Sequence, residues 1–381
     1  MKRCIVISDS FKGSLSSRAI CAIHKERIPL IFPGCEVIAL PVADGGEGTC
    51  ECFLEACGGE RVEVDGVQDP YGAPIRTAYA RLADGTAVIE MAAAAGLPLV
   101  AGRKNPMLTT TYGVGQLLRH AIDHGATRIV LGLGGSATND GGCGCAAALG
   151  VRFYDEAGQE FLPVGESLAR IASIDCSAAK ELLAGISLTA MCDIDNPMHG
   201  ENGAAYVFGP QKGADEAMVR RLDEGLRSLD RVITRCLGLN VASLPGAGAA
   251  GAFGAGCIAF LGATLARGIE VVLDTVHFDE LLRGADVVFT GEGQIDAQSL
   301  RGKVICGVAR RSAKAGVPVI AIVGNVADNA YDAYDIGVSA IFSINRLAIP
   351  RSEAKRRSST DYTHTLDDVL RCWKAAQMSR H

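Results

Sequence analysis

Acidic residues follow several apolar runs of the chain, each at the point where the run ends. They are Asp9, Asp44 with Glu47, Asp140, Asp193 with Asp195, and Glu292 with Asp296. One acid at the start of a loop commonly forms a turn or caps a helix. Several carboxylates in one place repel one another unless a cation or a proton-transfer duty is present. Because ligands bind beyond the carboxyl ends of parallel strands, this repeated placement predicts Mg²⁺ binding and general-base chemistry.

A glycine-rich loop follows one of these apolar runs. The segment IVLGLGGSATNDGG, residues 129–142, contains five glycines. A strand, a glycine-rich turn and a following helix present backbone N–H groups and the positive end of the helix, which favour an anion and above all a phosphate. The alternative is a glycine turn in which Asn139 or Asp140 caps the helix. Lys12 and Lys303 lie in or just after two other such loops, where either lysine could contact a phosphate or a carboxylate.

Two nucleotide-binding motifs can be compared with the chain. RGKV lacks the upstream glycine and the following Ser or Thr of a P-loop, so a nucleotide site of that kind is not expected. PGAGAAG carries Gly246, Gly248 and Gly251 in a GxGxxG pattern, with Asp274 further on, which favours an NAD-dependent hydroxy-acid dehydrogenase as the alternative function. Pro245 and the poor strand VASL weaken this alternative, because the fingerprint needs a strand that enters the turn.

The composition excludes several classes of protein. The 381 residues are 48% hydrophobic and 21% charged, enough for two domains with full cores. A net charge of −6 without a long basic stripe predicts no binding of nucleic acid. The uncharged segment 245–266 has the length of a membrane span, but it is mostly Gly and Ala. We therefore expect it to pack tightly inside the protein, with no membrane as partner.

The cysteines indicate the compartment. Fourteen are scattered along the chain, and no secretory segment precedes the first apolar run at residues 4–7, which predicts reduced thiols in the cytoplasm. The pairs Cys50/Cys52 and Cys143/Cys145 lack a second pair at metal-ligand spacing, so we expect small buried fillers and no zinc site.

The patterns along the chain define its secondary structure. Three segments, beginning near residues 4, 36 and 285, share the order of an apolar strand, a loop with an acid and an amphipathic helix. This alternation predicts a parallel sheet with helices on both faces. Residues 61–91 instead alternate polar and apolar residues across turn signals, which predicts an antiparallel meander. The last strands are expected at 318–323 and 340–344. A closing helix follows them with apolar residues on one face: Leu366, Val369, Leu370 and Trp373.

The fold class that follows is α/β with two domains. Both chain ends, residues 1–65 and 280–381, are expected to form a three-layer α/β/α domain with a parallel sheet of the Rossmann or flavodoxin type. Residues 66–279 form an inserted mixed α/β domain, and the active site is expected in the cleft between the domains. The sequence leaves the oligomeric state open.

Several long motifs together resemble one family, the bacterial glycerate kinases of the type that phosphorylates the 2-hydroxyl. The resemblance covers essentially the whole chain through DSFKGSLSS, ADGGEGT, DPYGAPI, TTTYGVGQL, GGSATNDGG, CDIDNPMHGENGAAYVFGPQKGA, PGAGAAGAFGAG and TGEGQIDAQSLRGK. It implies ATP-dependent transfer of phosphate to D-glycerate, a two-domain fold and a cytoplasmic role. The chain departs from the family pattern at Gln294, where arginine is frequent, and at Ala252, where glycine is common.

Phosphoryl transfer requires a protein to position the reactants, neutralise charge and receive the hydroxyl proton. Six residues are expected to bind ATP: Gly134, Gly135, Ser136, Thr138, Asn139 and Glu292. Asp193 and Asp195 are expected to bind Mg²⁺, unless the segment 193–197 is only a turn.

The remaining residues act on glycerate. Lys12 is expected to offset charge on the γ-phosphate, and Asp44 or Asp296 to accept the hydroxyl proton. Either Arg301 or Lys303 anchors the carboxylate, and Asp9 and Ser14 complete the substrate site. A non-catalytic sensor of phosphorylated metabolites would use the same loops, but it would not need so many carboxylates.

Overall fold

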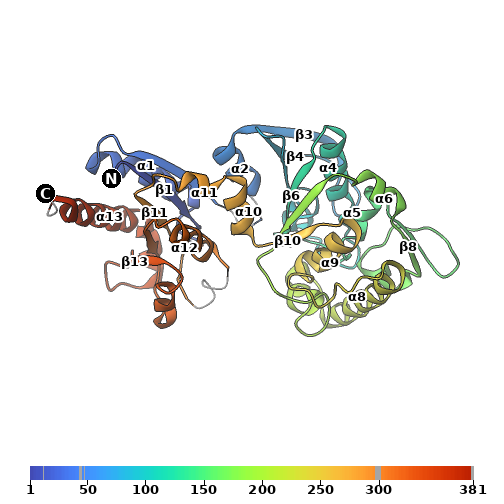
Figure 1. Cartoon of the computed structure of the whole chain (residues 1–381). Coiled ribbons are helices and arrows are strands. Elements are labelled where there is room, and N and C mark those ends of the chain that lie inside the picture. Colours follow the sequence, from blue (N-terminus) through green and yellow to red (C-terminus); the bar gives the residue numbers. More distant parts are fainter. Residues whose placement is uncertain (12, 43–44, 47, 297–301, 379–381) are drawn as a thin grey trace. The chain divides into compact units, whose positions relative to one another are not determined.

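The chain forms two compact units (Figure 1). The computed structural model describes residues 1–11, 13–42, 45–46, 48–296 and 302–378. Unit 1 comprises Met1–Ala43, Glu55–Cys57 and Arg267–His381, and unit 2 comprises Asp44–Leu54 and Gly58–Ala266. Each unit contains its own sheet and its own hydrophobic core, which confirms the α/β class expected from the sequence.

Unit 1 is built on a parallel sheet with the strand order β13-β12-β11-β1-β2. Its strands are β1 (Arg3–Ser8), β2 (Glu36–Pro41), β11 (Val287–Thr290), β12 (Val319–Val323) and β13 (Val338–Ser343). Its helices are α1 (Ser17–Ile31), α10 (Gly268–Thr275), α11 (Phe278–Leu281), α12 (Val304–Lys314), the short 3-10 helix η5 (Asp328–Ala333) and α13 (Arg351–Met378).

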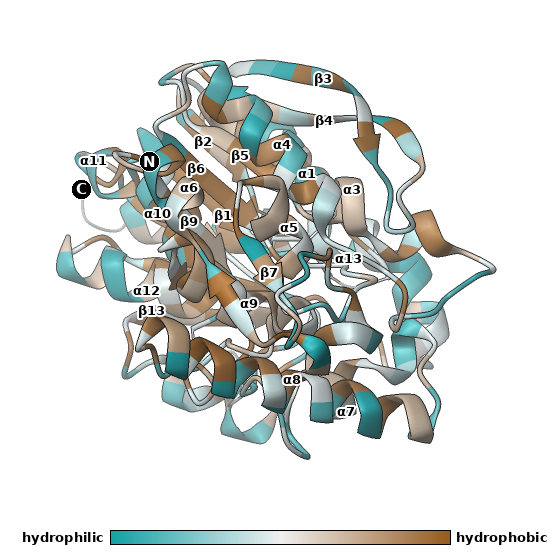
Figure 2. Ribbon diagram, turned by 90° about the vertical axis from the view of Figure 1, so that its right-hand side faces the viewer, coloured by the Kyte–Doolittle hydropathy of each residue, from teal (hydrophilic) through white to brown (hydrophobic). Residues whose placement is uncertain are grey.

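Helices cover both faces of this sheet. Ile320 and Ile322 of β12 pack with residues of α1 and α13, whereas Ala321 and Val323 pack with residues of α12. Consecutive side chains of a strand point to opposite faces, so the sheet is the middle layer of three. A strand covered on both faces is apolar along its whole length, and the ribbons near the labels β1, β5 and β6 are mainly brown in Figure 2, whereas β3 carries teal segments. The predicted three-layer arrangement is confirmed.

The ends of several helices agree with the sequence signals. Ser16 caps α1, since its side chain accepts a hydrogen bond of 3.2 Å from the N–H of Ala19. Helix α2 (Thr49–Cys57) ends at Gly58, which has a φ of 68°. The predicted closing helix is α13, in which Leu366 and Leu370 are fully buried.

Unit 2 contains a six-stranded mixed sheet with the order β10-β9-β6-β5-β4-β3. The predicted meander forms its antiparallel part, and the strands from β5 to β10 are parallel. The strands are β3 (Gly59–Gln68), β4 (Pro74–Leu82), β5 (Ala87–Glu90), β6 (Arg128–Gly132), β9 (Ser187–Met191) and β10 (Thr264–Ala266), and a separate hairpin consists of β7 (Arg152–Tyr154) and β8 (Ser173–Asp175). The helices are α3 (Ala92–Ala95), α4 (Tyr112–Asp123), α5 (Cys143–Ala148), α6 (Ser177–Leu182), α7 (Ala204–Phe208), α8 (Glu216–Leu237), α9 (Ala249–Leu261) and the 3-10 helices η1 (Leu97–Val100), η2 (Gly165–Arg170) and η3 (Pro210–Lys212).

The division between the units differs from the expected boundaries at 65 and 280. Strand β3 lies wholly in unit 2, because it pairs with β4 from Gly59 to Gln68. Helices α10 and α11 lie in unit 1, where Arg311 of α12 forms ion pairs with Glu270 and Asp274 of α10.

The Gly/Ala segment is internal. Helix α9 packs so closely that a Cβ at Gly251 would lie 2.1 Å from the carbonyl oxygen of Thr138, and one at Gly256 would lie 2.2 Å from that of Gly141. Only glycine permits such backbone approach. No helix in the described ranges is long and apolar enough to cross a membrane. The described residues include all fourteen cysteines, and no disulfide joins any two of them.

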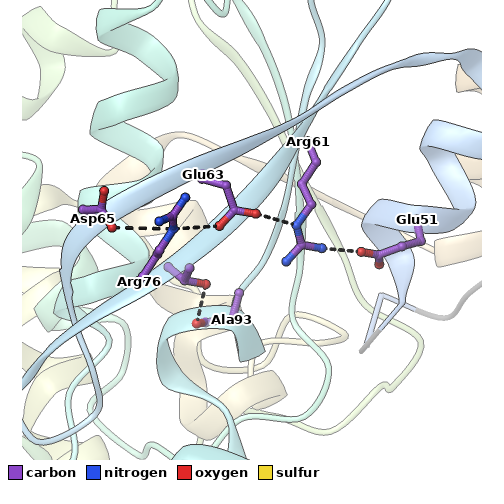
Figure 3. Close-up of polar contacts among 7 residues, drawn as sticks. Glu51, Arg61, Glu63, Asp65, Arg76 and Ala93 are labelled. Carbon is purple, nitrogen blue, oxygen red and sulfur yellow. Dashed lines mark hydrogen bonds and ion pairs between the residues drawn. The ribbon is translucent and has the colours of Figure 1, made fainter.

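A chain of ion pairs lies on the surface of the β3–β4 hairpin (Figure 3). Arg61 of β3 bridges Glu51 of α2 at 2.6 Å and Glu63 at 3.0 Å, and Glu63 also pairs with Arg76 of β4 at 3.4 Å. Because these side chains are exposed to solvent, each pair contributes little to stability. The chain of charges instead marks the solvent-facing side of this hairpin.

Candidate active site

The glycine-rich loop joins β6 to α5 at the carboxyl edge of the unit 2 sheet, and neighbouring segments fix it. The N–H of Gly134 donates to the carbonyl of Gly45 at 3.0 Å, and the N–H of Ala137 donates to that of Ala95 at 2.8 Å. The N–H of Gly141 donates to Gly251 at 3.1 Å. A Cβ at Gly134 would lie 2.6 Å from the Cα of Gly46, so a larger residue there would displace the loop.

The N–H groups of this loop divide into two sets. Those of Gly134 and Ala137 are held by the protein, whereas those of Gly135, Ser136, Thr138 and Asn139 donate to no group in the described part of the chain. These four residues are among those expected to bind ATP. Backbone N–H groups gathered in one loop can hold a phosphate. Gly135 is exposed, whereas Ser136, Thr138 and Asn139 are buried, so a phosphate that contacts all four N–H groups requires a movement of the loop.

Asp140 closes the start of α5. Its carboxylate is fully buried and accepts hydrogen bonds from the N–H and hydroxyl of Thr111 at 2.7 and 2.8 Å, and from the N–H groups of Gly142 and Gly144 at 3.1 and 3.2 Å. Burial raises the pKa of Asp140, and these hydrogen bonds oppose that shift. Asp140 therefore satisfies two N–H groups at the start of α5, which is the role that the helix-cap alternative gave it. Binding of a phosphate by the loop before Asp140 stays a prediction.

Lys212 was not foreseen as a site residue. It ends η3, is only 2% exposed, and its Nζ donates to Ser136 Oγ at 2.7 Å and to the Thr138 carbonyl at 2.6 Å. Burial lowers the pKa of Lys212 to about 7, and the charge of Asp140 opposes this shift. The motif FGPQKGA contains this lysine, but a single lysine beside a glycine gives no sign of burial, so only the tertiary structure identifies it.

The two expected Mg²⁺ ligands follow β9. Asp193 and Asp195 are both exposed. The end of their loop is anchored, because the N–H of Gly248 donates to the Asn196 carbonyl at 2.9 Å. Among the described residues, no group of three or more His, Cys, Asp or Glu side chains is arranged to hold a metal ion. Mg²⁺ usually takes one or two carboxylates together with phosphate and water, so two exposed carboxylates are a donor set that fits it.

Unit 1 gathers a second set of site residues at the carboxyl edge of its own sheet. Asp9 follows β1, and its N–H donates to the carbonyl of Gly291 after β11 at 2.9 Å. Glu292 is buried, and its carboxylate lies 3.8 Å from the Nζ of Lys303. Since β1 and β11 are neighbouring parallel strands, their ends bring these charged residues to one edge.

The other expected residues of unit 1 are more exposed. Asp296 is half-buried and accepts a hydrogen bond of 3.3 Å from the side chain of Gln294. Ser14 is exposed and donates to the Phe11 carbonyl at 3.1 Å in the turn before α1. Lys12, Asp44 and Arg301, together with Glu47, lie outside the described residues.

The dinucleotide fingerprint is not borne out. Residues 238–248, which precede α9 and are all described, contain no strand that could enter the turn at Gly246. Gly248 packs instead against the loop after β9, where a Cβ would lie 2.2 Å from the Pro197 carbonyl. Asp274 belongs to unit 1 and pairs with Arg311 at 2.6 Å. The fingerprint needs these parts within one strand–turn–helix unit, so this basis for a dehydrogenase is removed.

These features define an α/β protein with a braced glycine-rich loop and charged residues at the carboxyl edges of two sheets. Comparison with known proteins gives the family: residues 4–374 match the glycerate kinase family. The chain belongs to this family. It is 43% identical to a glycerate kinase of Bacillus cereus, with 98% of each chain covered. It is 42% identical to the glycerate 2-kinase of Escherichia coli K12, with 89% of this chain and 90% of the relative covered.

A solved structure agrees with this assignment. A crystal structure from Salmonella typhimurium LT2, assigned as glycerate kinase 2, superimposes with a TM-score of 0.86. The two chains are 40% identical, and the match covers 99% of each. The similarity therefore extends through both units.

Proposed function

We propose that the chain transfers the γ-phosphate of ATP to the 2-hydroxyl of D-glycerate and so forms 2-phosphoglycerate and ADP. The observation that carries this proposal is the similarity along about nine tenths of the chain to a relative named glycerate 2-kinase. The glycine-rich loop and the charged strand ends described above supply the kinds of groups that phosphoryl transfer needs. No observation in the described residues favours a second function.

ATP binds at the loop after β6 in this proposal. The N–H groups of Gly135, Ser136, Thr138 and Asn139 donate to phosphate oxygens, and Gly134 permits the close packing that shapes the loop. Support comes from the hydrogen bonds of the described part of the chain, in which these N–H groups donate to no other group. Glu292 is also expected to act in the ATP site. Its ion pair with Lys303 suits it to orienting that lysine.

Asp193 and Asp195 are the residues that would hold Mg²⁺. When bound, the ion supplies positive charge that neutralises phosphate oxygens. The two carboxylates follow β9, the immediate neighbour of β6 in the sheet, and both are exposed to solvent. This adjacency of strands supports their acting on the same polyphosphate.

Most of the substrate residues would come from unit 1, and Asp44, one of the two candidate bases, belongs to unit 2. Asp296 or Asp44 accepts the proton of the glycerate hydroxyl, and Lys12 offsets charge on the γ-phosphate. Lys303 or Arg301 binds the glycerate carboxylate, with Asp9 and Ser14 completing the site. Lys303 is 44% exposed at its side chain, so it is accessible to a ligand. The location of the site between the two units and a cytoplasmic setting remain predictions from the sequence.

The proposal is tested by incubating the protein with ATP, Mg²⁺ and D-glycerate, following ADP release and identifying the product by phosphorus NMR. A 2-phosphoglycerate signal supports the proposal. A 3-phosphoglycerate signal keeps the kinase and overturns the hydroxyl assignment. ADP release no faster than in the control without glycerate overturns the substrate.

A further inference from the structure

We propose that Lys212 is a positioning residue that holds the loop 135–139 in its ATP-binding conformation. Its buried ammonium group also places positive charge on the protein side of that loop. The inference deepens the proposed function and rests on it for the identity of the ligand. It names the residue that makes this loop attractive to a polyphosphate.

The contacts of Lys212 fix the middle of the loop. Its Nζ binds the side chain of Ser136 and the backbone of Thr138, at 2.7 and 2.6 Å. The residue between them, Ala137, is held by its N–H bond to Ala95 and by the hydroxyl of Thr109, which donates to its carbonyl at 3.0 Å. Three consecutive residues are therefore tethered from different segments, and the N–H groups around them are oriented together.

The ammonium group of Lys212 is buried. Among the described residues, no carboxylate lies within ion-pair distance, 4.0 Å, of its Nζ. A buried ammonium group is costly unless an anion compensates it. The carboxylate of Asp140 interacts with Lys212 only at longer range, and it is already engaged by Thr111, Gly142 and Gly144. A bound polyphosphate would supply the missing negative charge.

Two further side chains of the loop have buried polar atoms without hydrogen bonds among the described residues. The hydroxyl of Thr138 and both polar atoms of the Asn139 side chain are buried and make no hydrogen bond to any described residue. Buried polar groups are nearly always satisfied, so these groups independently indicate a ligand or a ligand-induced adjustment of the loop. Because Lys212 itself is 2% exposed, the ligand contacts the loop, and Lys212 acts through it.

The test compares Lys212→Met with Lys104→Met. Lys104 is a matched control, since its exposed Nζ donates to the carbonyl of Gln211 at 3.1 Å on the same turn. We expect Lys212→Met to raise the Kd and KM for ATP about tenfold or more, the loss typical of a hydrogen bond from a charged group. The KM for glycerate should stay within about twofold, and Lys104→Met should leave both constants unchanged. Unchanged ATP affinity in a folded Lys212→Met variant overturns the proposal.

A double-mutant cycle with Ser136→Ala tests whether Lys212 acts through the loop. We expect the two substitutions together to weaken ATP binding by less than the product of their separate effects, and independent effects overturn the proposal. If Lys212→Met does not fold, Lys212→Gln, which keeps a donor without the charge, replaces it in both experiments. ATP binding is measured without glycerate, so wild-type protein that binds ATP but does not phosphorylate glycerate overturns only the proposed function. Wild-type protein that binds no ATP overturns the role of Lys212.

Discussion

Lys212 and Asp140 are two buried ionisable residues with different hydrogen-bond partners, so each contributes differently to the pH dependence of protein stability. Asp140 is surrounded by hydrogen-bond donors, whereas Lys212 has two neutral acceptors and no close carboxylate among the described residues. Burial therefore shifts the pKa of Lys212 down to about 7. This shift makes the protonation of one side chain measurable as a change in stability.

The first prediction concerns this linkage. The folded state binds fewer protons at Lys212 than the unfolded state between pH 7 and about 10.5, so its contribution to stability rises with pH. Relative to Lys212→Met, the wild type should gain up to about 1.4 kcal/mol per pH unit above pH 7. Urea unfolding of both proteins at pH 7, 8 and 9 measures this difference. A gap that does not change with pH contradicts a lowered pKa in the folded state.

The second prediction concerns the metal ligands. Asp193→Asn removes a carboxylate from the loop after β9, and we expect kcat to fall by roughly tenfold or more with a higher Mg²⁺ requirement. Asp65→Asn is the control, because Asp65 is an exposed acid of the β3–β4 hairpin, 3.6 Å from Arg76 and remote in the sheet order from β9. The measurement is a titration of the activity of the wild type and both variants with Mg²⁺. Equal Mg²⁺ dependence in all three proteins removes Asp193 from the site.

At the scale of the element, α9 begins with three consecutive residues in the left-handed region. Ala250, Gly251 and Ala252 have φ values of 55°, 71° and 67°. Only Gly251 adopts such a φ without steric cost. The carbonyl of Gly251 accepts the N–H of Gly141 at the end of the glycine-rich loop, so this kink supports the loop. The strain at Ala252 lies at the position where the resemblance described above leads us to expect glycine.

The third prediction follows from this strain. Ala252→Gly relieves a left-handed alanine that costs about 1 kcal/mol or more, while the extra flexibility of glycine costs roughly 0.5–1 kcal/mol. We expect a free energy of unfolding equal to the wild type or higher by up to about 1 kcal/mol. Ala255→Gly is matched in burial but has helical dihedrals, and it should lose about 1 kcal/mol. Equal losses in both variants would show that Ala252 is not strained.

Regular elements were predictable from the sequence where the pattern was local. Apolar runs predicted β1, β12 and β13, of which β1 and β12 are buried almost throughout and β13 only at Val338. The spacing of Leu366 and Leu370 predicted the buried face of α13. The strand β10 was hidden within the Gly/Ala segment, because its three residues are held by pairing with β9 and not by their own propensity. The role of Lys212 was also not predictable from local sequence, because its partners lie more than 70 residues away in the chain.

At the scale of the whole molecule, each unit has a separate core. The largest cluster of buried apolar residues runs from Val64 to Ala263 and lies entirely in unit 2. The larger described cluster of unit 1 combines residues from both chain ends, such as Val6 with Phe289 and Leu366, whereas a smaller one lies between residues 295 and 338. Unit 2 is thus nearly one continuous stretch of chain, whereas unit 1 needs two distant stretches to complete its sheet.

The fourth prediction is that residues 45–266 fold alone. The fragment keeps all six strands of the mixed sheet, the whole of core 64–263 and the contacts of Gly45 and Gly46 with the glycine-rich loop. We expect cooperative thermal unfolding and dispersed NMR signals, as for a domain of this size. The separate pieces 1–42 and 267–381 provide the contrast, because neither contains the complete parallel sheet and neither should fold alone. A disordered 45–266 fragment contradicts independent cores.

The two ends of that fragment meet at one residue. Ala266 pairs with Met191 at the edge of the sheet, and a Cβ at Gly45 would lie 3.1 Å from the Cβ of the same Met191. A stretch of chain whose beginning and end lie this close can be cut out or spliced in with a short linker. We therefore expect unit 2 to be transferable as a domain, and a circular permutant that joins its ends and opens a surface turn such as 83–85 should retain the glycine-rich loop intact.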